Sequence, residues 1–158
     1  MAYGTTTIGN NVLLMAGTHV AHDCIISDNV IMANMSTLGG HVEIKEYASL
    51  GGGVLVHQFC KIGSHVFIGG GFRVVQDVPP FILAAGEPLR YGGINSIGLK
   101  RRGFTTETLT NIKKAYRKYF RSDLPRSSVL EKMKNEMEDS VEIEEIINFI
   151  DTSKRGII

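Results

Sequence analysis

The sequence predicts a mainly β protein in which a parallel β-helix of short repeats is followed by a C-terminal α-helical domain. Three observations carry this prediction: a high glycine content, an apolar residue at every sixth position, and a change to helical patterns beyond residue 80. Glycine makes up 18 of the 158 residues, about 11% against a usual value of about 7%. The fold therefore needs many tight corners.

An apolar residue occupies every sixth position from residue 8 to residue 74. The residues are Ile8, Leu14, Val20, Ile26, Met32, Leu38, Ile44, Leu50, Val56, Ile62, Ile68 and Val74. Since 43% of the chain is hydrophobic, twelve apolar residues in twelve steps would arise by chance from only about one starting position in tens of thousands. A period of six excludes a helix and is typical of hexapeptide β-helices, in which three hexads make one coil of roughly 18 residues. The sequence therefore predicts about four coils within a repeat domain over residues 1–79. Glycines such as Gly9, Gly51, Gly63 and Gly69 follow the inward apolar residue, where we expect the chain to round a corner and a Cβ to be costly.

Helical patterns replace this rhythm after the prolines at residues 79 and 80. A connecting segment that contains glycine and proline is predicted over residues 80–103, and a helical domain over residues 104–158. The first helix is expected to begin at Thr105 or Thr106, and its apolar stripe is Leu109, Ile112, Ala115, Tyr116, Tyr119 and Phe120. The second is expected to begin at Ser127 or Ser128, and its stripe is Val129, Leu130, Met133 and Met137. The stripe of the third is Val141, Ile146, Ile147, Phe149 and Ile150. Each stripe has the spacing that buries one face of a helix.

Charge is divided unevenly along the chain, although the net charge is only +1. Residues 1–79 hold three basic and five acidic residues, whereas residues 90–134 hold twelve basic and three acidic residues. The basic segment indicates a docking surface for an anion or an acidic partner, with a solvated helix face as the alternative. Nucleic acid is not expected, because no nucleic-acid-binding motif accompanies the charge.

The remaining composition limits the class of protein. No apolar run approaches the roughly 18 residues that a membrane span needs, and Met1 begins no charged and apolar leader, so we expect a cytoplasmic protein.

Cys24 and Cys60 occupy inward positions two coils apart, roughly 10 Å, which is too far for a disulfide.

Histidines gather at one corner when residues 18 apart are stacked at the inter-strand spacing. The neighbouring columns are His22, Gly40 and Gln58; Asp23, His41 and Phe59; and Ala21, Gly39 and His57. We therefore expect His22, His41 and His57 at one corner, with His19 just before it, and His65 at another corner.

This corner favours general-base catalysis by His22. Asp23 can orient its ring and stabilise its cation, and the Gly40 backbone N–H can serve as a donor to an oxyanion. No serine shares the column, which favours direct transfer without an acyl-enzyme. Zinc binding through His19 and His22 is the second interpretation, and corner histidines that only bond the backbone are the third; we expect no metal.

Five sequence runs give the chain a specific resemblance. They are HVAHDC (19–24), GGHV (39–42), VHQFCKIG (56–63), QDVPPF (76–81) and GLKRRGF (98–104). In this order, across essentially the whole chain, they resemble the UDP-N-acetylglucosamine acyltransferases of lipid A biosynthesis. The resemblance implies a cytoplasmic homotrimer of left-handed β-helices with active sites between neighbouring subunits. The implied reaction moves an R-3-hydroxyacyl group from acyl carrier protein to the 3-hydroxyl of the glucosamine in UDP-N-acetylglucosamine.

The same resemblance implies a role for each matching residue. His22 is the implied base, Asp23 its partner and the Gly40 N–H the oxyanion donor. The implied binding residues are His19, His41, His57 and Gln58 for the sugar and acyl donor, and Asn95, Arg101 and Arg102 for the uridine and its phosphates, with the arginines reaching in from the neighbouring subunit. Gly70 corresponds to a position that measures acyl-chain length. The resemblance also implies that the protein needs no cofactor of its own, because phosphopantetheine arrives on the acyl carrier protein.

Some alternatives stay open at this point. Pro88 stands where some members of the family carry a histidine at the end of the acyl groove, which leaves the chain length open. A 3-amino acceptor, an acetyl-CoA donor and an inactive truncated trimer are further possibilities. Members of the family carry several coils before the position of Met1, so we expect the chain to be a truncated form that lacks part of the substrate cleft.

Overall fold

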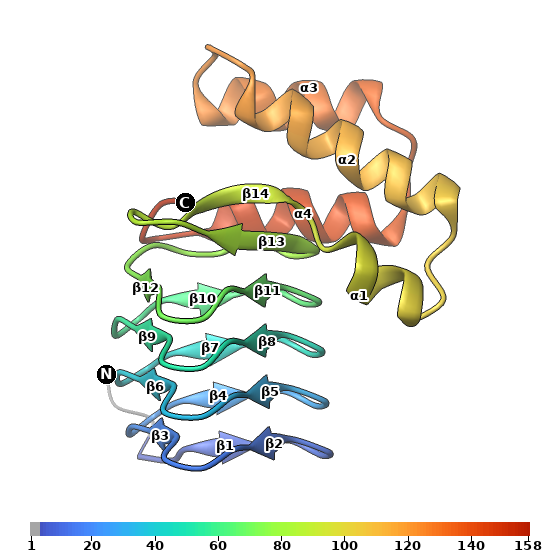
Figure 1. Ribbon diagram of the computed structural model, residues 1–158. Coiled ribbons are helices and arrows are strands. Elements are labelled where there is room, and N and C mark those ends of the chain that lie inside the picture. The colour runs from blue at the N-terminus through green and yellow to red at the C-terminus, as the bar shows by residue number, and fades with distance from the viewer. Residues whose placement is uncertain (1–3) are drawn as a thin grey trace.

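A computed structural model of the chain describes residues 4–158, so the expectation placed on Met1 lies outside the described residues. Its N-terminal half is a parallel β-solenoid of two-residue strands (Figure 1). The strands are β1 (Thr7–Ile8), β2 (Leu13–Leu14), β3 (His19–Val20), β4 (Ile25–Ile26), β5 (Ile31–Met32), β6 (Thr37–Leu38), β7 (Glu43–Ile44), β8 (Ser49–Leu50), β9 (Leu55–Val56), β10 (Lys61–Ile62), β11 (Phe67–Ile68) and β12 (Arg73–Val74). Every third strand pairs in parallel, so that the coils stack as three sheets, β1-β4-β7-β10, β2-β5-β8-β11 and β3-β6-β9-β12.

The register of these sheets confirms the 18-residue coil. Thr7 lies opposite Ile25, and Ile25 lies opposite Glu43. Residues 18 apart in the sequence are therefore neighbours in adjacent coils, and the columns drawn from the sequence are real columns of the structure.

Glycines of the corners allow neighbouring coils to approach one another. A Cβ on Gly63 would lie 2.4 Å from the backbone nitrogen of Pro80 in the next turn, and a Cβ on Gly51 would lie 2.5 Å from that of Gly70. Neither glycine has a positive φ. Most left-handed corner positions hold side chains, such as those of His41 and His65, while Gly17, Gly53 and Gly71 fill others. Close approach, more than backbone conformation, therefore explains Gly51 and Gly63.

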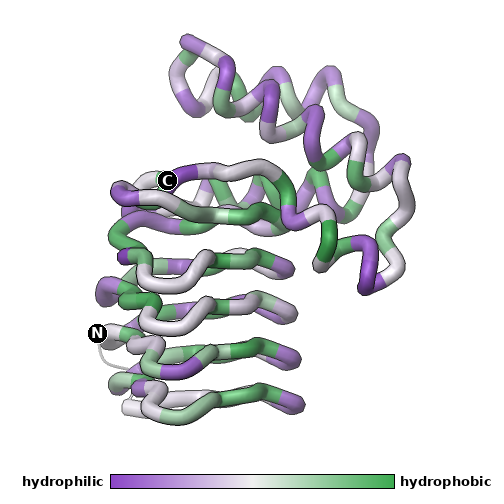
Figure 2. The backbone as a smooth tube through the Cα atoms, viewed as in Figure 1, coloured by the Kyte–Doolittle hydropathy of each residue, from purple (hydrophilic) through white to green (hydrophobic). Residues whose placement is uncertain are grey.

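Apolar residues recur along the coils of the solenoid (Figure 2), and the inward residues of the six-residue period form its core, as predicted. Inward residues from Ile26 to Val74 are buried, whereas Ile8 in the first coil is 46% exposed. Cys24 and Cys60 are buried, free thiols, which confirms the prediction made for both.

Secondary structure fills the segment over residues 80–103, for which the sequence predicted no element. β13 (Ile82–Ala85) continues the second sheet beside β11, and β14 (Arg90–Ile94) folds back antiparallel to it. A short helix, α1 (Ser96–Arg101), follows. The hairpin was missed because it abandons the six-residue period: Phe67 pairs with Leu83, a shift of 16 residues instead of 18.

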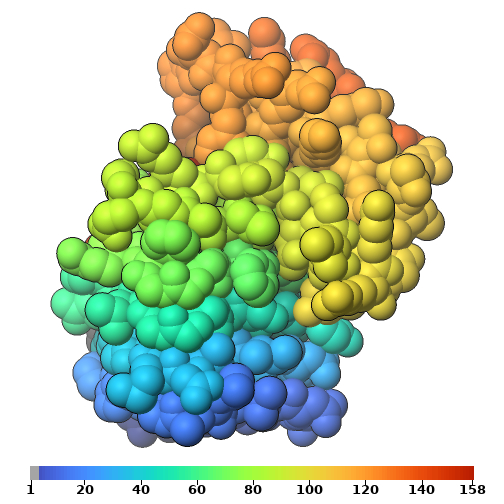
Figure 3. Space-filling view, viewed as in Figure 1, coloured from blue at the N-terminus to red at the C-terminus, as the bar shows by residue number. Residues whose placement is uncertain are grey.

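Three longer helices complete the chain at the C-terminal end of the solenoid (Figure 1, Figure 3). They are α2 (Thr106–Phe120), α3 (Arg126–Glu136) and α4 (Val141–Thr152). Thr105 caps α2 through its hydroxyl, as predicted. The predicted start of the second helix at Ser127 or Ser128 is wrong, because α3 begins at Arg126 behind Pro125 and has no side-chain cap. None of the described helices has the length and apolar character that a membrane crossing requires.

The helices and the C-terminal tail are tied to the last coil by buried polar contacts. The Tyr116 hydroxyl donates to the Pro80 carbonyl at 2.5 Å, and Ser64 donates to Glu145 of α4 at 2.5 Å. The buried Asp77 accepts from Ser153 at 2.6 Å and forms an isolated parallel bridge with Ile157. The position of the helices relative to the solenoid is therefore defined by specific hydrogen bonds as well as by apolar packing.

Candidate active site

A histidine–carboxylate pair stands at the corner between β3 and β4. Nδ1 of His22 lies 2.8 Å from Oδ2 of Asp23. The side chain of Asp23 is only 4% exposed, whereas that of His22 is 72% exposed. Because a carboxylate can only accept, the pair places the ring proton on Nδ1 and leaves the Nε2 lone pair for a substrate.

The turn holds Asp23 firmly. Its φ of 59° is in the left-handed region, which aspartate tolerates better than most residues. Its other carboxylate oxygen, Oδ1, accepts from the backbone N–H of Gly4 at 2.6 Å. The carboxylate is thus a fixed point from which the exposed imidazole is oriented.

His41 lies in the next coil, directly above Asp23. Its Nε2 is 3.8 Å from Oδ2 of Asp23, and its ring meets that of His22 edge to face, with 5.2 Å between the centroids. Phe59, one coil further, stacks on His41 at 4.7 Å. The predicted column of Asp23, His41 and Phe59 is therefore continuous in the structure.

Gly40 is the residue that makes room for the His22 ring. A Cβ on Gly40 would lie 2.6 Å from Cε1 and 2.8 Å from Nε2 of His22. Within residues 4–158, no hydrogen bond is formed by the Gly40 N–H. A backbone donor is therefore available close to the free nitrogen of His22.

The other predicted residues of this corner stand apart from the pair. His19, His57 and Gln58 are exposed, and Nδ1 of His57 lies 3.0 Å from the carbonyl of its neighbour Gln58. Of the four histidines that the sequence assigned to this corner, the described contacts join two, His22 and His41. The other two flank them.

The geometry changes the zinc interpretation of this corner. The ligand atoms of His22, Asp23 and His41 all lie within 4.8 Å of one another, whereas the sequence had pointed to His19 and His22. Two imidazoles and a carboxylate form a donor set that zinc accepts. The expectation of no metal stays a prediction.

The predicted nucleotide residues lie at a different corner of the solenoid. Asn95 caps α1 by accepting from the Gly98 N–H at 3.2 Å, and it donates to the His65 carbonyl at 2.9 Å. Arg102 follows the end of α1 and donates to the Tyr47 carbonyl at 3.3 Å. A cavity of about 470 Å³ adjoins them. It is lined by Ile31, Ser49, Phe67, Leu83, Asn95, Ile97, Gly98, Arg101 and Arg102.

Gly70 occupies the third corner, between β11 and β12. A Cβ there would lie 3.1 Å from the Gly52 carbonyl oxygen of the coil below. The predicted base, the predicted nucleotide residues and the predicted chain-length position therefore lie at three separate corners of one subunit, and a single copy of the chain does not bring them together.

Sequence reasoning did not identify Tyr47, and it noted His65 only as a histidine at another corner. Their rings stack at 4.9 Å, beside Arg102. Burial and the neighbouring Arg102 charge lower the pKa of His65 from 6.5 to about 4. The 18-residue spacing of these two residues was the signal that could have found them.

The fold and the histidine corner assign the chain to a class of proteins, the hexapeptide-repeat transferases. Residues 5–40 match the model of the bacterial transferase hexapeptide repeat. Residues 77–158, which include the helices and carry no such repeat, match the second domain of UDP-N-acetylglucosamine O-acyltransferase. The chain belongs to the UDP-N-acetylglucosamine O-acyltransferase family.

Relatives and solved structures agree with this assignment. Proteins named acyl-acyl-carrier-protein–UDP-N-acetylglucosamine O-acyltransferase from Thermodesulfovibrio yellowstonii and Syntrophobacter fumaroxidans are 49% and 47% identical over 98% of the chain. The chain spans 60% of the length of each. Crystal structures of UDP-N-acetylglucosamine acyltransferases from Bacteroides fragilis and Francisella novicida match 99% of the chain, with TM-scores of 0.97 and 0.94 and identities of 47% and 39%. The chain covers 61% and 57% of those structures.

Proposed function

We propose that the chain carries the catalytic base of an acyltransferase that moves an R-3-hydroxyacyl group from acyl carrier protein to the glucosamine 3-hydroxyl of UDP-N-acetylglucosamine. This reaction is the first step of lipid A biosynthesis. The observation that carries the proposal is the 2.8 Å pair of His22 and Asp23 beside Gly40, in a chain whose relatives bear the name of that enzyme.

The site residues account for each proton and bond of the transfer. Nε2 of His22 takes the proton of the sugar 3-hydroxyl as its oxygen attacks the thioester carbonyl carbon. The Gly40 N–H donates to the oxyanion that forms, and Asp23 stabilises the imidazolium. The C–S bond then breaks, and His22 returns its proton to the phosphopantetheine thiolate. The protein needs no cofactor of its own for these steps.

A homotrimer is the assembly that the surface favours. Exposed apolar side chains point outward from the second sheet, at Leu13, Ile31 and Phe67. The other two sheets each expose one large outward apolar side chain, Ile25 and Leu55, among polar ones. A subunit with one apolar face can form a closed ring in which that face packs on a different face of the next copy. We propose that this ring sets the His22 corner of one copy against the α1 corner of its neighbour, from which Arg101 and Arg102 would reach the sugar nucleotide.

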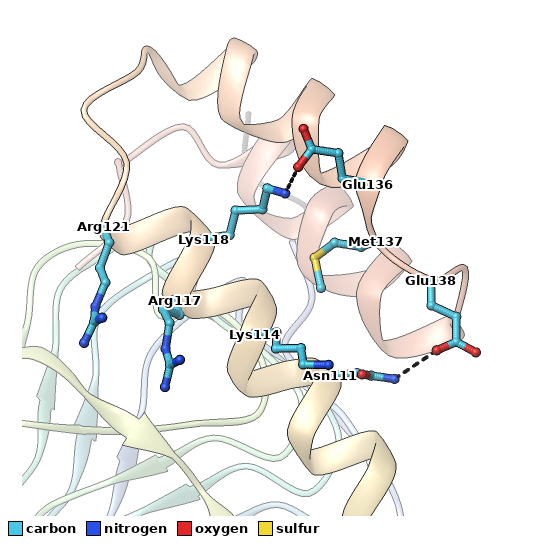
Figure 4. A pocket seen from close by; sticks show the side chains of 8 residues that line it. All are labelled: Asn111, Lys114, Arg117, Lys118, Arg121, Glu136, Met137 and Glu138. Carbon is cyan, nitrogen blue, oxygen red and sulfur yellow. Dashed lines mark hydrogen bonds and ion pairs between the residues drawn. The ribbon is translucent and has the colours of Figure 1, made fainter.

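Acyl carrier protein is the proposed partner of a basic face on α2. A cavity of about 550 Å³ lies between α2 and α3 (Figure 4). Its lining residues are Asn111, Lys114, Arg117, Lys118, Arg121, Glu136, Met137 and Glu138. Lys118 pairs with Glu136, whereas Arg117 and Arg121 point to the same side of α2 (Figure 4). An acidic carrier protein would be attracted to this face, and a cytoplasmic location follows from such a donor.

Replacing the base tests the proposal. We expect His22→Ala to lower acyl transfer from 3-hydroxyacyl carrier protein to UDP-N-acetylglucosamine by about 10²- to 10⁴-fold, without a change in melting temperature or trimer mass. Glu131→Ala, a change at an exposed position of α3 outside the proposed site, is the control and should keep normal activity. Near-normal turnover of His22→Ala would exclude His22 as the base. A wild-type chain without transfer activity would overturn the proposal for this chain.

A further inference from the structure

An aromatic column stands at the corner that carries the nucleotide residues. Tyr47 and His65 are 18 residues apart, and their rings stack with 13° between the planes. Phe81 stacks on the other side of His65 at 5.7 Å, and Phe104 meets its edge at 5.0 Å. The backbones of Tyr47, His65 and Phe81 all have φ between 55° and 66°, and their side chains form one continuous stack.

The column holds both ends of α1. At the start of the helix, the Asn95 side chain donates to the His65 carbonyl. At its end, the Arg102 guanidinium lies 5.2 Å from the centroid of the Tyr47 ring and donates to the Tyr47 carbonyl. A helix of six residues has little stability of its own, so these two attachments determine where it lies.

The attachment leaves part of the arginine unused. Nη2 of Arg102 is bonded to Tyr47, while Nη1 is buried and has no hydrogen-bond partner among the described residues. Burial lowers the pKa of Arg102, but a guanidinium stays charged at neutral pH. A guanidinium carries five N–H donors, and the Tyr47 carbonyl uses one of them, so Arg102 keeps further donors that can bond an anionic oxygen.

The histidine of the column completes the arrangement without adding charge. With a pKa of about 4, His65 is neutral at physiological pH and does not repel the neighbouring guanidinium. Its neutral ring also stacks on Tyr47, which in turn lies under Arg102. A lysine or arginine in this position would oppose the charge of Arg102.

We propose that Tyr47 and His65 are positioning residues, which fix α1 and aim Arg102 at the diphosphate of the nucleotide. This inference rests on the proposed function. Neither residue needs to touch the substrate. The Tyr47 ring acts through Arg102, whereas His65 holds Asn95 through its backbone carbonyl and supports Tyr47 through its ring.

Calorimetric titration of the full chain with UDP tests the inference. We expect Tyr47→Ala to weaken UDP binding about fivefold, less than Arg102→Ala does, because alanine removes the ring under the guanidinium but keeps the backbone carbonyl that accepts from Nη2. Tyr47→Phe should keep binding within about twofold, because the ring remains. In an Arg102→Ala background, Tyr47→Ala is expected to add little further loss. Uridine, which has no phosphate, is the matched probe, and its binding should be unaffected by Tyr47→Ala.

The outcomes separate this inference from the proposed function. If Tyr47→Ala weakens UDP binding equally with and without Arg102, or if Tyr47→Phe fails to preserve binding, the positioning role is wrong. If Arg102→Ala leaves UDP binding unchanged, or the wild-type chain does not bind UDP, the proposed nucleotide site itself is wrong. Tyr47 is 37% exposed, so its variants should fold, and thermal melts confirm this. His65→Phe, which keeps a neutral stacking ring, provides a second variant that should bind UDP normally.

Discussion

Gly40 and His22 are in such close contact that the glycine has no room for a side chain: a Cβ would lie 2.6 Å from Cε1 of the imidazole. The two residues are 18 apart and belong to successive coils. The position of the proposed base is therefore set partly by the backbone of the coil above it. A side chain at residue 40 should therefore affect the activity of the protein and its stability to different extents.

Gly40→Ala should damage activity while leaving stability almost unchanged. The obstructed atom belongs to a side chain that is 72% exposed, so the ring can rotate away at a cost of no more than about 0.5 kcal/mol. The displaced base should lower kcat at least about tenfold. Steady-state kinetics and thermal melts measure the two effects. Gly39→Ala is the contrast, because its Cβ would lie 2.7 Å from the backbone nitrogen of Gln58 and should destabilise the fold. Full activity of Gly40→Ala would show that His22 need not lie against residue 40.

Asp23→Asn should slow transfer by about 10- to 1,000-fold without unfolding the protein. An amide cannot stabilise the imidazolium, and its NH₂ group can favour the tautomer with the proton on Nε2. The ¹⁵N chemical shifts of His22 report the tautomer, and kcat reports the rate. A variant with unchanged tautomer and unchanged rate would contradict the role given to the 2.8 Å contact.

Tyr116→Phe should lower the free energy of unfolding by about 1–3 kcal/mol. The Tyr116 hydroxyl is buried and donates to the Pro80 carbonyl, so its removal leaves that carbonyl without this partner. Chemical denaturation of the two proteins measures the difference. Tyr119→Phe is the control on the same helix, because none of the hydrogen bonds found within residues 4–158 involves its hydroxyl. Equal effects of the two changes would mean that the bond to Pro80 does not stabilise the attachment of α2.

Stability should fall as the pH is lowered from about 6.5 toward 4, through His65. The unfolded chain binds a proton at an ordinary histidine pKa, whereas the folded chain resists protonation until about pH 4, so acid favours the unfolded state in this window. His65→Phe should reduce this dependence. Thermal melts of both proteins at several pH values measure it, with His57→Phe at an exposed position as the control. Parallel pH profiles of wild type and His65→Phe would contradict the lowered pKa.

Much of the site could be predicted because the repeat turns sequence distance into spatial distance. Spacings of 18 residues placed Gly40 above His22 and His41 above Asp23, and both relationships are present in the structure. The same arithmetic did not show that His57 turns to the carbonyl of Gln58, because side-chain orientation at an exposed corner depends on local contacts that have no period.

The rest depended on segments that leave the repeat. Nothing in the pattern of residues 80–103 predicted the β13–β14 hairpin. Nor did it predict that Asn95 and Arg102 would attach α1 to Tyr47 and His65. Those contacts join residues separated by 30 and 55 positions, with no fixed spacing to reveal them.

The sequence by itself determined the solenoid and the 18-residue coil, because a six-residue apolar period buries its hydrophobic residues regularly only in such a coil. It also indicated the His22–Asp23 pair, because the two residues are adjacent in the chain. Only the tertiary structure decided that Gly51 and Gly63 are needed for close approach of coils, and that α3 begins without a side-chain cap. It also decided that His65 is neutral beside Arg102. These features depend on burial, contact and charge between residues that are distant in sequence, and a local pattern does not contain that information.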